Sequence, residues 1–443
     1  WQMMLLRRTV QGKLSEMFGE RTVTIDEAMR RFDLYRLAQA SLAVQDEETL
    51  SALEAYSAGV NAWLAAVNSK ALGRGAPEFW RFTPEIAPWQ PADSLALVKL
   101  LAVQLSTHLE SEVRRARASI LLGNDRLKDI LPDAPGDAVI SLPEFASLFP
   151  DAPRRLARSE PPRPLDPLSP MKPAPFGGAS NAWAAAPSRS AAGGTLLAND
   201  PHLEFTAPVI WYLSRLELEN GGVIGAGIPG IPAILTGRSA DLGWGITSAY
   251  VDNQDIFIEQ LNPDNPEEYR TLGGFKAFET RKSVIQVEGS APVTITLRWT
   301  DNGPVLPGEL FDLGTITPPG HVTAINWTAL SASDTSLGAA MNLMQAKSVD
   351  QALEAAENFV SPPQNLTVVD RERIALKVVG AMPRRAAAHQ SQGRIPSPGW
   401  RPQNRGQGIL GYSANPEVID PEGGLIGNTN NKTSDRAFPL HLS

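Results

Sequence analysis

The chain has 443 residues, of which 42% are apolar and 20% charged, a balance typical of globular proteins. Its net charge of −8 argues against binding along a nucleic-acid backbone, which requires a basic face. The absence of cysteine excludes thiolate catalysis, zinc–thiolate sites and disulfides, and no apolar run approaches the roughly 18 residues of a membrane-spanning helix.

The first 130 residues are predicted to be helical. Thr24 and Glu27 have the spacing of a capping box, in which a hydroxyl and a carboxylate three residues later satisfy each other's backbone amides. Apolar residues at helical spacing predict a second helix over about 50–67, with its stripe at Leu53, Tyr56, Val60, Trp63, Leu64 and Val67. A third helix is predicted from about Asp93 to Leu121, with a charged tail.

A proline-rich segment follows the helices. Eight of the 37 prolines lie between Asp151 and Ser180, together with several arginines. Proline fixes φ and lacks a backbone N–H, so this segment is predicted to form neither a long helix nor a central strand. We interpret residues 131–179 as a linker, and both an ordinary exposed connector and a segment that is cut or removed fit its composition.

After Ser180 the sequence is predicted to be rich in β-strands. Short apolar runs that end in Gly, Pro, Asn or Asp predict strands over 222–226, 234–237, 255–261, 293–299, 321–328, 365–369 and 374–379. Helical stripes recur near 338–346 and 349–358. Helices followed by a strand-rich part indicate an α+β fold rather than regular βαβ alternation.

Two short motifs match known sites but do not fit their sequence context. The run Gly225–Gly230 matches GxGxxG, but prolines occur where a dinucleotide site needs a helix, so we predict a turn between strands. Ser169 and Lys172 match SxxK, but the surrounding prolines prevent the helix that would place the lysine beside the serine. The five histidines have no metal-ligand spacing, so no zinc site is expected.

The most informative stretch surrounds Ser180. Here Gly177-Gly178-Ala179-Ser180-Asn181-Ala182-Trp183 is followed by Leu196-Leu197-Ala198-Asn199-Asp200-Pro201-His202-Leu203. This order resembles the penicillin acylase branch of the N-terminal nucleophile hydrolases. The resemblance also covers 1–19, 227–261 and 364–385, and therefore touches most of the chain. It implies a four-layer αββα architecture, in which two stacked sheets lie between helical layers.

The resemblance implies that Ser180 is the nucleophile and becomes a new N-terminus by self-cleavage after Ala179. A serine hydroxyl is a poor nucleophile without a base. The new α-amine would supply that base, because its ordinary pKa of about 7.7–8.0 lies close to working pH. In this family the hydroxyl first attacks the preceding carbonyl and shifts the acyl group from N to O, and water then releases it. Without the resemblance, Ser180 would be a serine at the edge of a strand.

Four further positions take their expected roles from the resemblance. His202 is expected beside the nucleophile, where it would orient the α-amine or a bridging water. The backbone amide of Ala249 and the side chain of Asn365 match the two donors of an oxyanion hole, which stabilises the negative charge that develops during acyl transfer. Arg385 resembles an arginine that supports this asparagine, and the neighbouring Arg384 remains the alternative.

The resemblance also implies a structural calcium ion and no organic cofactor. Asp252 and Asp255 match calcium ligands of the family, and Glu112 would reach over from the helical part. Calcium prefers several hard oxygen ligands, and carboxylates from both parts would tie the two pieces together after cleavage. A DxxD pair taken alone is more often a loop cap.

The expected activity is hydrolysis of a linear amide of an N-acylated small molecule, such as a β-lactam antibiotic or an acyl-homoserine lactone. Leu203 is expected to face the acyl pocket, and the helix around 102–106 is expected to line it. A family member that binds acylated ligands without turnover is the first alternative. The second is a Ser–His–carboxylate hydrolase that uses Ser180 with His202.

The expected organisation has three parts: a helical segment over 1–130, the linker over 131–179 and a strand-rich segment over 180–443. Cleavage would turn one precursor into an α/β heterodimer. By resemblance the protein is expected in the periplasm or outside the cell. Trp1 and Ser443 match interior points of the family's sequences, so both ends are expected to be truncated.

Overall fold

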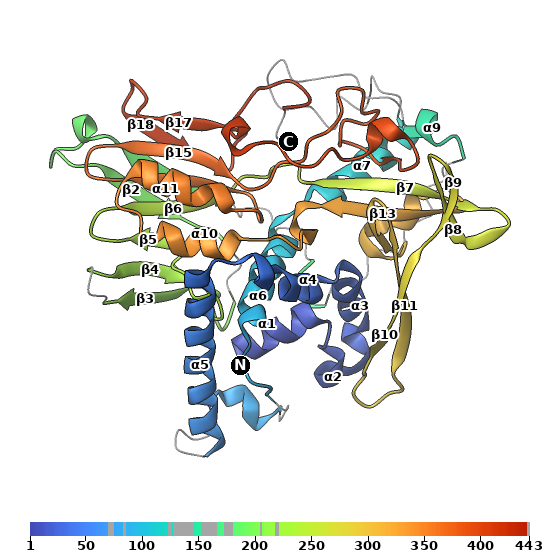
Figure 1. The fold of residues 1–443 in the computed structure, drawn as a ribbon, viewed down its shortest axis with the longest axis horizontal. Coiled ribbons are helices and arrows are strands. Elements are labelled where there is room, and N and C mark those ends of the chain that lie inside the picture. The colour runs from blue at the N-terminus through green and yellow to red at the C-terminus, as the bar shows by residue number, and fades with distance from the viewer. Residues whose placement is uncertain are drawn as a thin grey trace.

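The computed structural model describes residues 1–69, 75–82, 86–122, 126, 145–151, 166–171, 180–203, 206–217 and 221–440. The N-terminal part is helical and the later part is built mainly from strands (Figure 1), so the predicted α+β order is confirmed. The early helices are α1 (Gln2–Gln11), α2 (Ser15–Phe18), α3 (Val23–Phe32), α4 (Leu34–Ser41), α5 (Glu47–Asn68), α6 (Pro91–Leu105), α7 (His108–Leu121) and α9 (Phe145–Leu148). Helices α10 (Ser336–Leu343) and α11 (Val349–Ala355) come later.

Two antiparallel sheets carry the strands that surround Ser180. One has the order β18-β1-β2, and the other has the order β17-β15-β14-β6-β5-β4-β3. Their strands are β1 (Asn181–Ala185), β2 (Leu196–Asp200), β3 (Tyr212–Leu216), β4 (Val223–Gly227), β5 (Thr236–Arg238), β6 (Gly243–Ser248), β14 (Gln364–Val369), β15 (Ile374–Val379), β17 (Glu417–Ile419) and β18 (Leu425–Asn428).

A third sheet lies on the opposite side of the molecule (Figure 1). Its order is β10-β11-β12-β13-β7-β8-β9, and β16 pairs in parallel with β7. The strands are β7 (Gln254–Asn262), β8 (Asn265–Thr271), β9 (Gly274–Ala277), β10 (Glu279–Ile285), β11 (Val293–Thr300), β12 (Gly303–Leu306), β13 (His321–Trp327) and β16 (Ser397–Pro398). Helix α7 runs against β7, so this sheet meets the helical part directly.

The sheets around Ser180 are stacked on each other. Ala184 and Ile426 of the three-stranded sheet pack against Val369, Ile374 and Leu376 of the seven-stranded sheet. Helices α10 and α11 cover the other face of the seven-stranded sheet through a second apolar cluster. This gives the layer order α, β, β. On the outer face of the three-stranded sheet, large apolar side chains are exposed, namely Trp183, Leu196 and Leu425.

The helical part differs from the sequence prediction at two points. Helix α3 begins at Val23, so Thr24 lies inside the helix and does not cap it. A 3-10 turn over Gly19–Thr22 leads straight into α3, and the Glu20 carbonyl accepts the Val23 N–H, so a capping box is not needed. The long helix predicted to Leu121 is two helices, because the chain is extended at Ser106 between α6 and α7.

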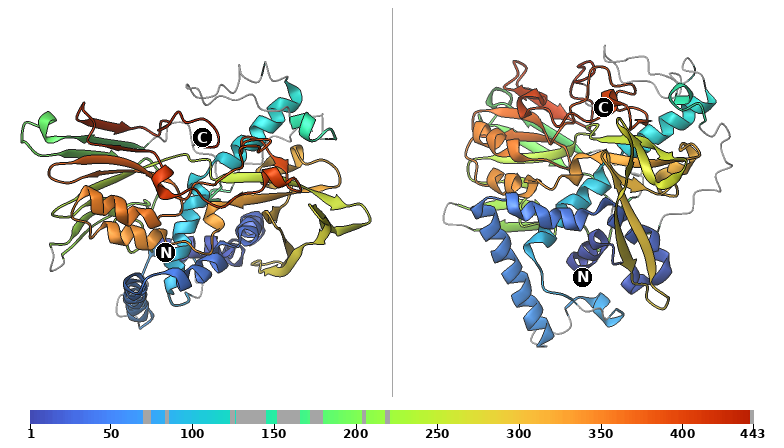
Figure 2. Two further views of the ribbon diagram at one scale, coloured as in Figure 1. Left: turned by 45° about the horizontal axis from the view of Figure 1, so that its top comes forward. Right: turned by 45° about the vertical axis from the view of Figure 1, so that its right-hand side comes forward.

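Tertiary contacts explain where the predicted long helix breaks. Leu109 lies in the first turn of α7, and its N–H donates to the Gln254 side-chain oxygen of β7 at 2.8 Å. This satisfies an amide that the end of a helix leaves without a partner. Before the break, α6 is buried on nearly all sides, which is typical of a central helix. Figure 2 shows it crossing between the helical part and the sheets.

The predicted helix over 50–67 is confirmed as α5. It begins after Asp46, whose carboxylate accepts the Thr49 N–H at 2.7 Å. Only Leu53 of the predicted stripe is buried, and Trp63 is exposed, because the far end of α5 extends away from the body of the molecule (Figure 1). Within the part of the chain that is described, no helix has the length and apolar character needed to cross a bilayer.

Part of the predicted linker packs into the core. Phe145 and Phe149 are buried, and the Phe149 ring meets Trp400 edge-on with the ring centroids 6.5 Å apart. The Arg21 guanidinium pairs with Asp166 at 2.7 Å. These described pieces are anchored to both the helical and the strand-rich parts. The rest of 131–179, including the expected cleavage position after Ala179, lies outside the described residues.

Candidate active site

Ser180 stands immediately before β1, next to the end of β2. The pairing of Asn181 with Asp200 brings the two strand ends together. The His202 backbone N–H then donates to the Ser180 Oγ at 3.0 Å. The His202 imidazole is turned away to the Asp200 carboxylate at 2.6 Å. The structure therefore places His202 next to Ser180, and the contact is made by its backbone and not by its ring.

Asn199 clamps β1 against β6. Its side-chain amide donates to the Asn181 carbonyl at 2.8 Å and to the Ile246 carbonyl at 3.0 Å. Its side-chain oxygen accepts from the Thr236 hydroxyl at 2.7 Å and from the Ile246 N–H at 3.2 Å. A Cβ on Gly245 would lie 2.6 Å from the Asn199 Cβ, so the clamp requires glycine there. The residue following Ser180 is thereby tied to the seven-stranded sheet.

Asn365 lies in β14 opposite Thr247 of β6 and is fully buried. Its amide nitrogen contacts the Thr247 hydroxyl at 3.1 Å, the Ser248 carbonyl at 3.2 Å and the Asn428 side-chain oxygen at 3.1 Å. The group expected to face a substrate oxyanion therefore has protein acceptors in this uncut chain.

Asn428 is a site residue that the sequence analysis missed. It ends β18 and pairs with Ala182 of β1, two residues after Ser180. Its side-chain oxygen accepts from the Thr247 hydroxyl at 2.6 Å, from the Asn365 amide at 3.1 Å and from the Asn430 N–H at 3.0 Å. It joins the strand that begins after the nucleophile to the two strands that carry the expected oxyanion donors. The signal in the sequence was the asparagine-rich run Gly427-Asn428-Thr429-Asn430-Asn431.

Ala249 follows β6 and lies close to Asn365. Its backbone N–H donates to the Pro363 carbonyl at 3.4 Å, which is at the long limit for a hydrogen bond. The preceding Ser248 carbonyl accepts both Asn365 and the Asn430 amide, the latter at 2.8 Å. The structure thus brings the two expected oxyanion donors to the same ends of β6 and β14.

Arg385 is buried in an acidic cluster. Its guanidinium Nε donates to the Asp255 carboxylate oxygens at 3.0 and 3.1 Å, and Nη2 contacts the Asp252 carboxylate and carbonyl, each at 3.2 Å. A Cβ on Gly393 would lie 2.5 Å from this guanidinium, so glycine leaves room for it. The structure therefore gives Arg385 partners other than Asn365. Arg384 is exposed.

Glu112 of α7 completes this cluster. It is 1% exposed and accepts the Ile256 N–H at 3.2 and 3.4 Å. Burial, followed by the neighbouring charges of Asp255 and Asp252, raises the pKa of Glu112 well above its ordinary value.

This cluster does not fit calcium as it is arranged. Both Asp255 oxygens bond Arg385, and the guanidinium lies among the carboxylates that were expected to bind the ion. Within the described ranges, no three acidic or histidine side chains are placed to hold a metal ion together. Calcium, which binds six to eight oxygen ligands, remains a prediction from the resemblance.

Leu203, which is expected to face the acyl pocket, lines neither of the two hollows described below. Leu203 is half-buried directly after His202. The residues Val103, Gln104 and Ser106 line a small cavity with Met171 and other apolar side chains at the break between α6 and α7. A larger hollow of about 530 Å³ lies around β12 and β13 and contains none of the candidate site residues.

The chain matches a known protein family over its whole length. A family model described as penicillin amidase matches residues 1–443. The acyl-homoserine lactone acylases QuiP of Pseudomonas aeruginosa and Pseudomonas putida are 29% and 30% identical over the whole chain, which covers 52% of each. Penicillin G acylase of Escherichia coli is 25% identical over 97% of the chain and 55% of its own length.

A solved structure shows the same fold. The thermostable penicillin G acylase from Alcaligenes faecalis matches with a TM-score of 0.52 and 27% identity, over 57% of this chain and 44% of that one. The chain spans about half the length of the curated relatives it matches.

Proposed function

Because the chain belongs to the penicillin amidase family, we propose that it contributes the catalytic centre of an amide hydrolase whose nucleophile is Ser180. The bond to be broken is the linear amide of an N-acylated small molecule. The observation that supports this most strongly is the junction at which the end of β18 meets three other strands. There Asn428 pairs with Ala182 of β1 and bonds both Thr247 of β6 and Asn365 of β14.

Self-cleavage before Ser180 would create the base that the site otherwise lacks. In the uncut chain the Ser180 Oγ accepts a backbone N–H, and the nearest imidazole, that of His202, bonds Asp200 instead. No described side chain is therefore in place to take the hydroxyl proton. A free α-amine on the same residue would lie within reach of the hydroxyl, and its ordinary pKa of about 7.7–8.0 suits proton transfer near neutral pH.

The oxyanion donors would then act on the substrate. Attack by the Ser180 Oγ on the substrate carbonyl carbon places negative charge on the carbonyl oxygen. The Asn365 side-chain amide and the Ala249 backbone N–H are the donors proposed to receive it, each worth about 3 kcal/mol by analogy with other oxyanion donors. Collapse of the intermediate expels the amine, which takes a proton from the α-ammonium group. Water then hydrolyses the acyl-enzyme.

The substrate class is inferred from the relatives. The first relatives are named acyl-homoserine lactone acylases, and others are named penicillin acylases. Both names describe removal of an acyl group from an amine on a small ring, and we propose a substrate of this kind. The cleaved protein would be a heterodimer of helical and strand-rich pieces, acting in the periplasm or outside the cell without an organic cofactor.

One observation favours an alternative in which the uncut protein only binds acylated ligands. The Asn365 amide has three protein acceptors, and the Ala249 N–H has one, so neither donor is free in this geometry. Turnover therefore requires the Asn365 side chain and the Ala249 backbone N–H to leave these partners once the chain is cut or once substrate binds.

Intact mass and N-terminal sequencing of the purified protein test the proposal. We expect a fragment that begins Ser-Asn-Ala-Trp, and release of a primary amine from an N-acyl-homoserine lactone or a penicillin. Acetylating the α-amine of the cut protein should abolish turnover, because it removes the base. A single uncut chain without turnover would favour the binding-only alternative. Activity that survives acetylation would favour a Ser–His–carboxylate mechanism.

A further inference from the structure

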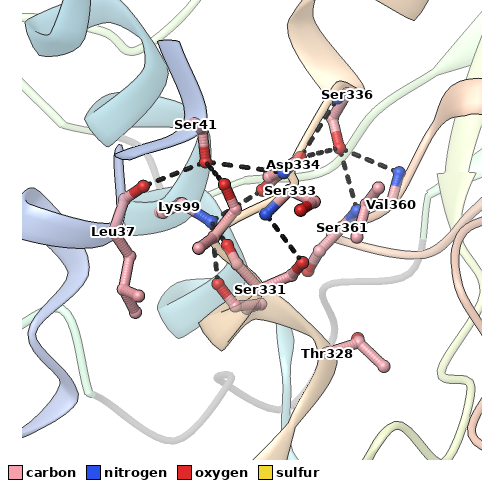
Figure 3. A network of polar contacts seen from close by, with 12 residues as sticks. Leu37, Ser41, Lys99, Thr328, Ser331, Ser333, Asp334, Ser336, Val360 and Ser361 are labelled. Atoms are coloured by element: carbon pink, nitrogen blue, oxygen red, sulfur yellow. Dashed lines mark hydrogen bonds and ion pairs between the residues drawn. The ribbon is translucent and has the colours of Figure 1, made fainter. Parts of the chain in front are cut away.

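A buried polar network joins helix α6 to the chain that leads into β14 (Figure 3). At its centre is Lys99 of α6, which is 1% exposed. Its ammonium group donates to the carbonyls of Ala329 and Ser331 at 3.0 and 2.8 Å and to the Asp334 carboxylate at 2.9 Å. All three ammonium protons are therefore used. The network fixes the loop between β13 and α10 against the helical part of the molecule.

Asp334 in turn orients Ser336, the first residue of α10. The second Asp334 oxygen accepts the Ser336 N–H at 3.1 Å and the Ser336 hydroxyl at 2.6 Å. A hydroxyl has one proton, so the Ser336 Oγ has only lone pairs left for other partners. It uses them to accept the backbone N–H groups of Val360 and Ser361, each at 2.9 Å. The buried hydroxyl therefore has three partners and one orientation.

The two amides held by Ser336 are the last backbone donors before β14. Pro362 and Pro363 follow them, and proline has no N–H. The N–H groups of Val360 and Ser361 therefore both donate to a single oxygen atom, the Ser336 Oγ. On the other side of the segment, the Pro363 carbonyl accepts the Ala249 N–H. A shift of this carbonyl would therefore change the surroundings of the Ala249 amide.

We propose that Ser336 is a positioning residue for the oxyanion hole, held in place by Lys99 and Asp334. It fixes the segment from Val360 to Pro363, and through it the relative placement of the Ala249 amide and Asn365. This inference rests on the proposed function, because only that function gives the two donors a substrate.

Oxyanion donors act on charge that develops only in the transition state, so their misplacement lowers kcat more than it raises KM. A displacement of about 1 Å can reduce the rate by about 100-fold. Loss of the Ser336 hydroxyl leaves the half-buried Val360 amide and the buried Ser361 amide without this acceptor, which favours a shift of the segment that carries them.

The test compares Ser336→Ala with the matched control Ser41→Ala. Ser41 is also fully buried in the network, and its hydroxyl contacts the Leu37 and Ala332 carbonyls at 2.9 and 3.0 Å. Its oxygen also accepts the Asp334 N–H at 3.4 Å, whereas the Val360 and Ser361 amides donate to Ser336. Both variants should lose stability, but only Ser336→Ala should change the oxyanion donors.

Turnover of an N-acyl-homoserine lactone is measured by the amine released. This rate is divided by the amount of protein cut at Ser180, which is determined by intact mass. We expect Ser336→Ala to lower kcat by at least tenfold with KM changed less than threefold. Ser41→Ala should keep both values within threefold of wild type at a temperature where it is folded. Unchanged kcat in Ser336→Ala, or equal losses in both variants, would overturn the inference.

Hydrogen exchange provides a readout that does not need activity. Peptides covering 246–250 and 358–364 should exchange faster in Ser336→Ala, including at the Ala249 amide, and should be unchanged in Ser41→Ala. If wild type shows no turnover, the proposed function fails while exchange still decides the positioning role. If Ser336→Ala does not fold, Ser336→Gly replaces it, because glycine leaves room for a water in place of the hydroxyl. The same changes in kcat and in hydrogen exchange are expected for this variant. Faster exchange confined to Val360 and Ser361 would refute the link to Ala249.

Discussion

Replacing Arg385 by methionine should strongly destabilise the protein. The side chain is 4% exposed and is the cation that contacts both Asp252 and Asp255. Methionine keeps much of the volume but leaves two buried carboxylates without this partner. Removing one member of a buried ion pair typically costs about 3–5 kcal/mol, because the remaining charge stays desolvated.

Thermal unfolding measures this loss. At about 1 °C per kcal/mol for a chain of this size, a loss of about 4 kcal/mol lowers Tm by about 4 °C. Arg384→Met is the matched control, since it removes the adjacent but exposed arginine. Its effect should stay within about 0.5 kcal/mol.

The same experiment distinguishes an internal guanidinium from a bound metal ion. With Arg385 as the cation of the cluster, a calcium chelator should leave the wild-type Tm unchanged. A Tm that falls with chelator and recovers with added calcium would refute this reasoning. An Arg385→Met variant as stable as Arg384→Met would refute it as well, because the cluster would then not depend on the guanidinium.

Three other changes test separate parts of the structure. Asn365→Ala should lower kcat by about 100- to 1,000-fold while leaving some self-cleavage, as measured by amine release and intact mass; full activity would exclude the proposed donor. Gly245→Ala should lower the free energy of unfolding in urea by about 1–3 kcal/mol, because its Cβ would lie 2.6 Å from the Asn199 Cβ. An unchanged free energy of unfolding would show that the Asn199 side chain can move to make room for the methyl group. Because the pKa of Glu112 is raised in the folded state, this group's contribution to wild-type stability should fall as pH rises above the ordinary glutamate value of about 4.3. Glu112→Gln should remove that dependence, and parallel stability–pH curves for the two proteins would contradict the assignment.

The sequence predicted the order of elements because their signals are local. Strands β7, β11, β13, β14 and β15 lie within a few residues of the predicted runs, since apolar alternation and turn residues determine them directly. The GxGxxG match covers the end of β4 and the turn that follows it, so no helix begins there, as its prolines indicated. The break between α6 and α7 could not be predicted, because the partner of the Leu109 amide is Gln254, which is distant in sequence.

The candidate site was predicted only in part, because some of its contacts join residues that are distant in the sequence. Ser180, His202, Ala249 and Asn365 belong to motifs that carry the resemblance. The clamp residue Asn199 and the junction residue Asn428 act through contacts between strands from different sheets. Arg385 was expected beside Asn365, but it lies among Asp252 and Asp255. Local sequence identifies such side chains and does not determine which buried partner each one meets.

The interlocked core has a consequence for how a cut molecule would behave. The largest apolar cluster mixes residues of the helical part, such as Leu97 and Val113, with residues of the strand-rich part, such as Ile256 and Ile325. After cleavage before Ser180, these contacts and the Lys99–Asp334 ion pair would join two separate polypeptides. Renaturation would then be a bimolecular reaction whose yield depends on protein concentration, whereas the uncut chain refolds in a unimolecular one. Cleavage would thus make denaturation at low concentration effectively irreversible, although it removes only a single peptide bond.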